Sequence, residues 1–173
     1  MRSSIPDGRD AFRSAACSEM MCGTDTRRSR WGAQFEVLKG NSVTVGLVPA
    51  ALLEYFEARG DLPCGWCWEP GVYMWDSLGP CHGGKQRHPH IRSWSSWESD
   101  WEGKAGYNEG DTVGLVLDYE DNGGTLTAYK NNVRLGVLVP NEREPSLGPG
   151  PFCWAVDVMG QGCAVRFSWS IDE

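Results

Sequence analysis

The sequence GDTVGLVLDYEDNGGTLTAYKNNVRLGVLV, residues 110–139, combines strand periodicity with turn chemistry over its whole length. In its first part, Val113, Leu115 and Leu117 alternate with smaller or more polar residues, as the side chains of a half-buried strand do. Residues 121–124, Asp-Asn-Gly-Gly, tolerate positive φ and so allow the chain to reverse. This part of the stretch therefore predicts a β-hairpin.

The second part of the stretch repeats this arrangement. Residues 125–130 follow as the next strand, and Asn131-Asn132 provides a second reversal, because Asn is the non-glycine residue best suited to a left-handed backbone. Beyond this turn the apolar residues alternate again, at Val133, Leu135, Val137 and Val139. The stretch as a whole predicts three antiparallel strands.

Short apolar runs bounded by Gly, Pro, Asn or Asp occur along most of the chain, which is typical of strands. Residues 43–48 are nearly all apolar and predict a central strand, whereas residues 50–60 predict a turn or two of helix. Residues 152–158 and 163–169 predict a closing hairpin. Another strand is predicted at residues 31–38, where one face is apolar and consists of Trp31, Ala33, Phe35 and Val37.

The length of the chain and its pattern of short apolar runs fit one all-β domain. A chain of 173 residues is long enough to fold around its own core. We expect residues 30–170 to form a sandwich of two antiparallel sheets. Residues 1–29 are expected to be an N-terminal tail that can supply an edge strand at residues 16–21, and residues 171–173 a C-terminal tail.

The charge and cysteine content restrict the class of partner and the compartment. The net charge is −7, which repels nucleic acids and anionic membranes, and the one basic cluster, Arg27, Arg28 and Arg30, is better explained as a solvated edge. No apolar run has the length of a signal peptide core or a membrane span. Seven irregularly spaced cysteines favour free thiols over a disulfide framework. We expect an intracellular protein, with the cytoplasm as its compartment.

Three groups of motifs in the correct order resemble the SPRY domain family. They are the GDTVGLVLD strand with the GTLTAYKNN hairpin, the WGAQFEV strand followed by VGL, and the closing hairpin in residues 152–169. The chain departs from the family pattern at Ala128, where an aromatic residue is usual, and at Asn132, where a glycine is usual. The resemblance covers about residues 30–170. It implies a bent, concanavalin-like or lectin-like jelly-roll sandwich without catalytic activity or a cofactor.

The resemblance also implies a binding site and a role. Family members often bind extended peptides through loops at one end of the sandwich, and the matching positions here are Asn41, Tyr55, Val158, Met159 and Gly160. Tyr55 and Met159 would supply apolar contacts, Asn41 a hydrogen bond, and Gly160 a close approach of the backbone. Family members commonly recruit substrates to ubiquitin ligases or belong to chromatin and channel complexes. We therefore expect a monomeric module that binds a protein or peptide.

A zinc site is the sharpest alternative in the sequence. Cys64 and Cys67 precede His82 and His88 at a spacing close to that of a two-Cys, two-His finger. The glycines and prolines around the histidines do not allow the helix that such a finger needs. A small zinc-stabilised structural domain, with a turn-shaped knuckle completed by other nearby ligands, remains an alternative to packed thiols and surface histidines.

Two further interpretations are weighed against the binding module. Catalytic motifs are lacking, and the carboxylates of Asp118, Glu120 and Asp121 flank a turn, where they serve turn geometry and solubility. A lectin-like carbohydrate-binding module is the second alternative, because Asp, Asn and aromatic residues are plentiful. In residues 76–106, the tryptophans of WSSWESDW are interpreted either as a lid over one end of the sandwich or as an anchor for a partner.

Overall fold

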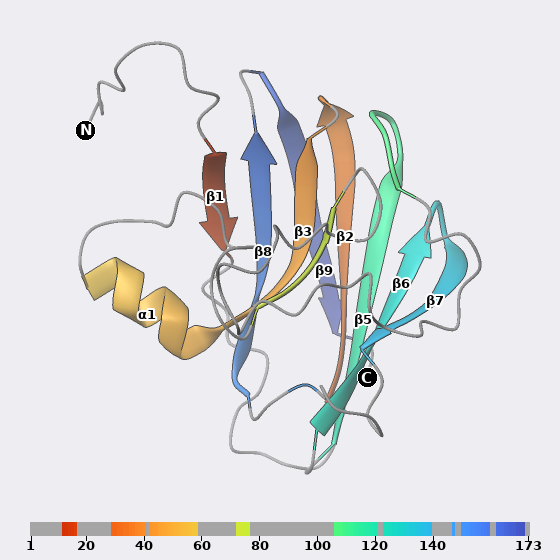
Figure 1. Ribbon diagram of the computed structural model, residues 1–173. Coiled ribbons are helices and arrows are strands. Elements are labelled where there is room, and N and C mark those ends of the chain that lie inside the picture. Colours follow the sequence, from red (N-terminus) through yellow and green to blue (C-terminus); the bar gives the residue numbers. More distant parts are fainter. Residues whose placement is uncertain are drawn as a thin grey trace, which may run out of the picture.

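The computed structural model describes residues 12–16, 29–40, 42–58, 72–76, 106–120, 123–139, 147, 150–159 and 162–171. Strands make up most of these residues (Figure 1). The elements in chain order are β1 (Phe12–Ala16), β2 (Ser29–Lys39), β3 (Val43–Pro49), α1 (Ala50–Ala58), β4 (Tyr73–Asp76), β5 (Thr112–Glu120), β6 (Gly123–Lys130), β7 (Val133–Val139), β8 (Phe152–Met159) and β9 (Ala164–Ile171).

The strands form two antiparallel sheets, one of four strands in the order β1-β8-β3-β4 and one of five in the order β7-β6-β5-β2-β9. Figure 1 shows the two sheets facing each other, with α1 beside the lower end of β3 and β8. The predicted all-β sandwich of two antiparallel sheets is confirmed. The only helix described has nine residues, and no helix in the described part of the chain is long and apolar enough to cross a membrane.

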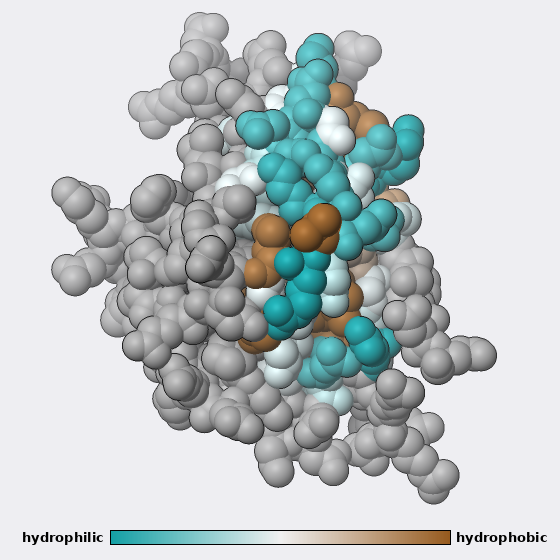
Figure 2. All heavy atoms as spheres, turned by 90° about the vertical axis from the view of Figure 1, so that its right-hand side faces the viewer, coloured by the Kyte–Doolittle hydropathy of each residue, from teal (hydrophilic) through white to brown (hydrophobic). Residues whose placement is uncertain are grey.

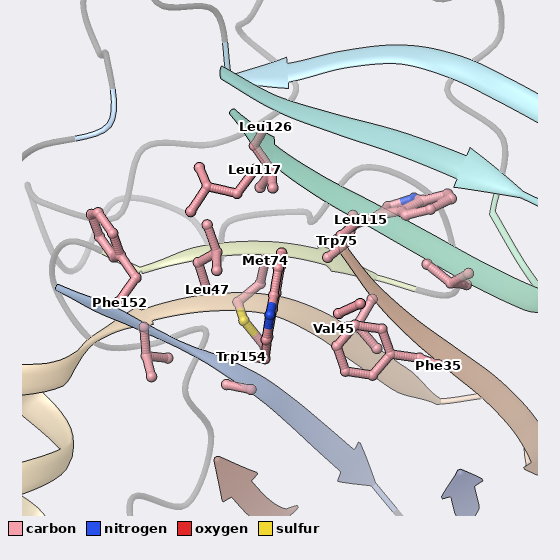
Figure 3. Close-up of a cluster of buried hydrophobic side chains, with 14 of the residues drawn as sticks. Phe35, Val45, Leu47, Met74, Trp75, Leu115, Leu117, Leu126, Phe152 and Trp154 are labelled. Atoms are coloured by element: carbon pink, nitrogen blue, oxygen red, sulfur yellow. The ribbon is translucent and has the colours of Figure 1, made fainter. Parts of the chain in front are cut away.

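The core lies between the sheets and follows the alternation of the strands. Val113, Leu115 and Leu117 of β5 are completely buried, as their period of two predicts. Figure 3 shows Leu115 and Leu117 opposite side chains from β3, β4 and β8 of the other sheet, among them Leu47, Trp75 and Phe152. Burial of these large apolar side chains is the main stabilising term of the fold, at about 25 cal/mol per Å² removed from water.

β3 is an inner strand, flanked by β8 and β4, which confirms the prediction from its apolar sequence. Gly46 allows β4 to approach it closely. A Cβ atom at Gly46 would lie 2.0 Å from the carbonyl oxygen of Tyr73 and 2.7 Å from the Cα of Met74. Any side chain at this position would therefore force β3 and β4 apart.

The regular apolar alternation predicted for β7 is not kept through the strand. Leu135 packs against the core, but Val133 is 64% exposed, and beyond Leu135 the buried residues are Gly136 and Leu138. The pairing of β6 with β7 shifts register twice, and Gly136 has a φ of 148°. Each shift changes which β7 residues lie opposite β6, so a regular alternation read from the sequence does not carry through the strand.

The N-terminal part of the chain contributes a strand to the four-stranded sheet. β1 pairs with β8 along its length, from Phe12 opposite Met159 to Ala16 opposite Ala155. The edge strand expected at residues 16–21 lies outside the described residues, apart from Ala16. The described edge strand therefore precedes the expected one in the chain.

Candidate functional site

Several connections between strands gather at one end of the sandwich, which we call the loop end. It comprises the chain after β2, the segment 106–111 before β5, the Asn131-Asn132 turn and the chain before β9. The end of β2 meets the start of β9, where Lys39 lies opposite Ala164, and the Asn131 N–H donates to the Thr112 carbonyl at 2.8 Å. In Figure 1 these connections lie at the upper end of the strands.

The carboxylate of Asp111 joins two of these connections to each other. Its Oδ1 accepts a hydrogen bond from Asn131 Nδ2 at 2.8 Å, and its Oδ2 accepts one from the Asn108 N–H at 2.8 Å. Lys130 Nζ lies 2.9 Å from Oδ2 as its ion-pair partner. Asn131 Oδ1 in turn accepts from the Thr112 N–H at 2.8 Å. Asp111 therefore fixes the 106–111 segment against the β6–β7 turn.

The electrostatic state of Asp111 follows from these contacts. Burial alone would raise its pKa, but hydrogen bonds from Asn131, Lys130 and Asn108, together with the positive charge of Lys130, outweigh burial and lower the pKa below its ordinary value. The carboxylate is consequently ionised throughout the neutral range. It acts as an acceptor with its oxygens already engaged, so it is poorly suited to proton transfer.

Further hydrogen bonds tie the 106–111 segment to both sheets. The Tyr107 hydroxyl lies 2.8 Å from the Val43 carbonyl oxygen of β3 and 2.7 Å from the Trp75 carbonyl oxygen of β4, and its side chain is fully buried. On the five-stranded sheet, the Gly110 N–H donates to the Val37 carbonyl at 2.8 Å. The loop end is therefore anchored to both layers of the sandwich.

Most of the exposed side chains at the loop end are polar, and they carry both charges: Lys39, Asn108, Glu109, Asn131, Asn132 and Arg134. Val133, beside the Asn131-Asn132 turn, is exposed as well and is apolar. Figure 2 looks onto the β6–β7 side of the molecule, where the described residues form a mainly hydrophilic band with a few hydrophobic side chains. The Glu109 carboxylate also accepts a hydrogen bond from the Gly40 N–H at 3.1 Å. This surface suits polar complementarity with another macromolecule.

The structure separates the site residues implied by the resemblance. Val158 and Met159 lie at the loop end, because Val158 pairs with Val43 at the start of β3. β3 then runs to Pro49, opposite Phe152, before α1 begins, and Tyr55 lies on α1. The length of β3 puts roughly 20 Å between Val158 and the start of α1. The structure therefore does not bring Tyr55 together with Val158 and Met159; Asn41 and Gly160 lie outside the described residues.

Tyr55 is a surface residue at the other end of the sandwich. Its side chain is 52% exposed, and its ring packs edge-on against Phe56 with the centroids 5.3 Å apart. Glu54 and Glu57 beside it are also exposed, whereas Ala50 and Leu53 are buried. Among the described residues, this end presents a short helix with exposed acidic side chains.

Other residues singled out in the sequence are only partly described. Cys64, Cys67, His82 and His88 lie outside the described residues, as does the WSSWESDW segment. Among the residues that the structure does describe, no group of three or more His, Cys, Asp and Glu side chains could hold a metal ion. Asp118 is exposed and lies 3.4 Å from Arg30 Nε in an ion pair, which supports the structural interpretation of this carboxylate.

Sequence reasoning missed the residues that hold the loop end together. Asp111, Asn108 and Lys130 were not singled out, and neither was Tyr107. The one available signal was the Asn131-Asn132 turn, because an Asn in the left-handed region at the end of a strand often caps a neighbouring segment. Its partner, 20 residues away in sequence, could not be inferred from local pattern.

No family model matches this chain, and no curated protein matches it significantly in sequence. The case for a function rests on the geometry of the loop end.

Proposed function

We propose that this chain is a non-catalytic interaction module of the SPRY type that binds a protein or peptide partner at the loop end. The observation that carries the proposal is the anchoring of several connections there. Asp111 ties the 106–111 segment to the β6–β7 turn, and Tyr107 ties the same segment to β3 and β4. Loops fixed on a rigid sandwich lose little conformational entropy when a partner binds.

The chemistry of this surface favours macromolecular recognition over catalysis. The Asp111 carboxylate is engaged on both oxygens, by Asn131 on Oδ1 and by Asn108 and Lys130 on Oδ2. The exposed side chains around it, such as Lys39 and Glu109, carry both signs of charge. Mixed surface charges steer and select a partner more than they increase affinity.

The SPRY assignment and the adaptor role are parts of the same proposal. The motif order in the sequence supports both, and it implies binding through loops at one end of the sandwich. Val158 and Met159, two of the residues implied by the resemblance, lie at the loop end. A module of this kind would recruit a substrate to a ubiquitin ligase, or hold a component of another assembly, through a further subunit.

Selection of peptides on the full chain tests the proposal. A random twelve-residue peptide display library is enriched on the immobilised protein, and the selected peptides are synthesised and titrated by fluorescence anisotropy. The double variant Lys39→Glu, Arg134→Glu is expected to change the affinity by about tenfold, since each exposed charge contributes up to about 1 kcal/mol. Tyr55→Ala, the matched exposed control at the other end, is expected to stay within about twofold.

Two results would contradict a peptide site at the loop end. If Tyr55→Ala abolishes binding while the double variant binds as the wild type does, the site lies on the α1 end. If the library yields no binder of the full chain, the proposal of a peptide-binding module is wrong.

A further inference from the structure

β9 forms one edge of the five-stranded sheet. It is eight residues long and pairs with β2 from Ile171, opposite Trp31, to Ala164, opposite Lys39. The register shifts once, between Val37 and Lys39, and is regular over the rest of the strand. Among the described residues no strand pairs with the other side of β9. β9 is thus a long and regular edge.

The direction of its backbone groups follows from a hydrogen bond of β2. The Val37 N–H donates to the Asp111 carbonyl at 3.0 Å, on the β5 side of β2. In an antiparallel ladder, alternate residues direct both their N–H and C=O groups to the same side. The even-numbered residues of β2 therefore direct these groups toward β9, where Gln34 lies opposite Ser168 and Glu36 opposite Arg166.

The same alternation fixes the outer side of β9. Because Arg166 and Ser168 direct their backbone groups toward β2, the residues between and beside them direct theirs away from the sheet. Val165, Phe167 and Trp169 hence present a row of N–H and C=O groups along the outer edge. Such a row is a template for a further strand.

β9 has few of the features that usually protect a strand edge. Proteins protect edges with charges, prolines, bulges or short strands. β9 contains no proline, and its single charged residue, Arg166, donates from Nη1 to Glu36 Oε2 of β2 at 2.6 Å, so this charge is directed along the sheet face. β1 and β4, the edges of the other sheet, have only five and four residues.

The opposite edge of the five-stranded sheet is protected in the usual way. β7 shifts register twice against β6 and contains Gly136 in a φ region that side chains rarely adopt. It also exposes Arg134 near its start. An incoming strand would therefore find a regular template on β9 and an irregular one on β7.

We infer that the outer edge of β9 binds one extended, basic segment of the partner, which adds a strand to the five-stranded sheet. The inference rests on the proposed function, because β9 begins at the loop end, where Ala164 lies opposite Lys39. A peptide held there continues along the edge in extended form, with its backbone supplying the affinity.

The net charge of the chain favours a basic peptide over a second copy of the chain as the segment that binds the edge of β9. The chain carries a net charge of −7, so two copies repel each other as they approach. A basic peptide is attracted by the same field, and the only charge on β9 is already paired. The partner segment is consequently expected to be extended and rich in Lys or Arg.

Amide hydrogen exchange of the free, full-length chain tests the edge directly. The amides of Val165 and Phe167 are expected to exchange at least about tenfold faster than those of Arg166 and Ser168, which bond to β2. Equal protection of all four amides in the monomeric protein would mean that the chain covers its own edge, and it would overturn the inference whether or not the chain binds a peptide elsewhere.

A peptide obtained from the display selection then tests whether a partner segment binds along β9. Its binding is expected to slow exchange at Val165 and Phe167 by at least about tenfold, and Val165→Pro, which removes an outward N–H, is expected to weaken binding by about tenfold. Ser168→Ala is the control on the same strand and is expected to stay within about twofold, since it changes an exposed side chain and keeps every backbone N–H group of β9. If Val165→Pro does not fold, the exchange measurement on the wild-type complex decides.

The outcomes separate this inference from the proposed function. A peptide whose affinity changes about tenfold in the Lys39→Glu, Arg134→Glu double variant, but which leaves Val165 and Phe167 unprotected, overturns the β9 assignment and leaves the loop end in place. Selected peptides without an excess of Lys and Arg overturn the assignment of a basic partner. Protection that appears with rising protein concentration, together with a dimer in sedimentation velocity, shows a second copy on the edge and overturns the peptide.

Discussion

The two ends of the sandwich differ in the side chains that join their described segments. At the loop end, Asp111 and Tyr107 connect segments that are distant in sequence, and both are hydrogen-bonded to more than one partner. At the other end, α1 rests on β3 and β8 through Ala50 and Leu53 and leaves Tyr55 exposed. Exposure of an aromatic side chain is thus insufficient to mark a binding site, because a site also needs a fixed frame.

The difference between the two ends can be measured as protein stability. Residues that join several segments of the chain contribute to the free energy of unfolding. Exposed residues that touch little contribute almost nothing. The substitutions below compare the two ends on this scale.

Tyr107→Ala is expected to have the largest effect. It removes a fully buried ring that packs edge-on against Trp75, with centroids 4.9 Å apart, and leaves a cavity between the sheets. The expected loss is about 3–5 kcal/mol in the free energy of unfolding, measured by urea denaturation. Tyr107→Phe keeps the ring and removes only the hydroxyl contacts, so it should cost about 1–3 kcal/mol. A Tyr107→Ala variant as stable as the wild type would contradict the anchoring of the loop end.

Asp111→Ala is expected to have the next largest effect. It breaks the bonds from Asn131 and Asn108 and leaves Lys130 without its ion-pair partner. Hydrogen bonds to a charged group support a loss of about 1–3 kcal/mol, again by urea denaturation. Asp111→Asn keeps the shape of the side chain and one acceptor oxygen. Its free energy of unfolding should therefore lie between those of Asp111→Ala and the wild type. Equal stability of all three proteins would show that the network does not hold the loop end.

The pH dependence of stability should also involve Asp111. Its pKa is lowered in the folded state by the hydrogen bonds from Asn131, Lys130 and Asn108, which outweigh the opposing effect of burial. The carboxylate therefore stabilises the fold above the ordinary Asp pKa of about 3.9, and this contribution is lost as the pH falls through the lowered pKa. Denaturation midpoints of the wild type should fall more steeply below about pH 5 than those of Asp111→Asn. If the denaturation midpoints of the two proteins fall equally steeply below about pH 5, the lowered pKa of Asp111 does not contribute to stability.

The sequence predicts the parts of the fold that depend on local features, namely the alternation of apolar residues and the residues of tight turns. Val113, Leu115 and Leu117 are buried as expected, and Asn131 and Asn132 have φ values of 51° and 64°, as a left-handed turn requires. These features depend on neighbours a few residues away, so the sequence carries them directly.

The parts that sequence does not predict depend on contacts distant in the chain. The core face of β7 changes because its pairing with β6 shifts register, and no residue of β7 alone signals this. The resemblance implies one site for Tyr55 and Val158, but a motif match says nothing about which end of a strand each segment occupies. Asp111 and Asn131 meet only after β5 and β6 have paired.

Tyr55→Ala is expected to have the smallest effect on stability. Its side chain is 52% exposed, and its ring packs on Phe56 within the same helix, so its removal should change the free energy of unfolding by less than about 0.5 kcal/mol. Leu53→Ala, which removes a side chain of the same helix that is only 6% exposed, should cost about 2 kcal/mol or more and shows that the assay responds to α1. A loss with Tyr55→Ala as large as that with Leu53→Ala would mean that this end is also held by its surface residues, and the contrast between the two ends would then rest on binding alone.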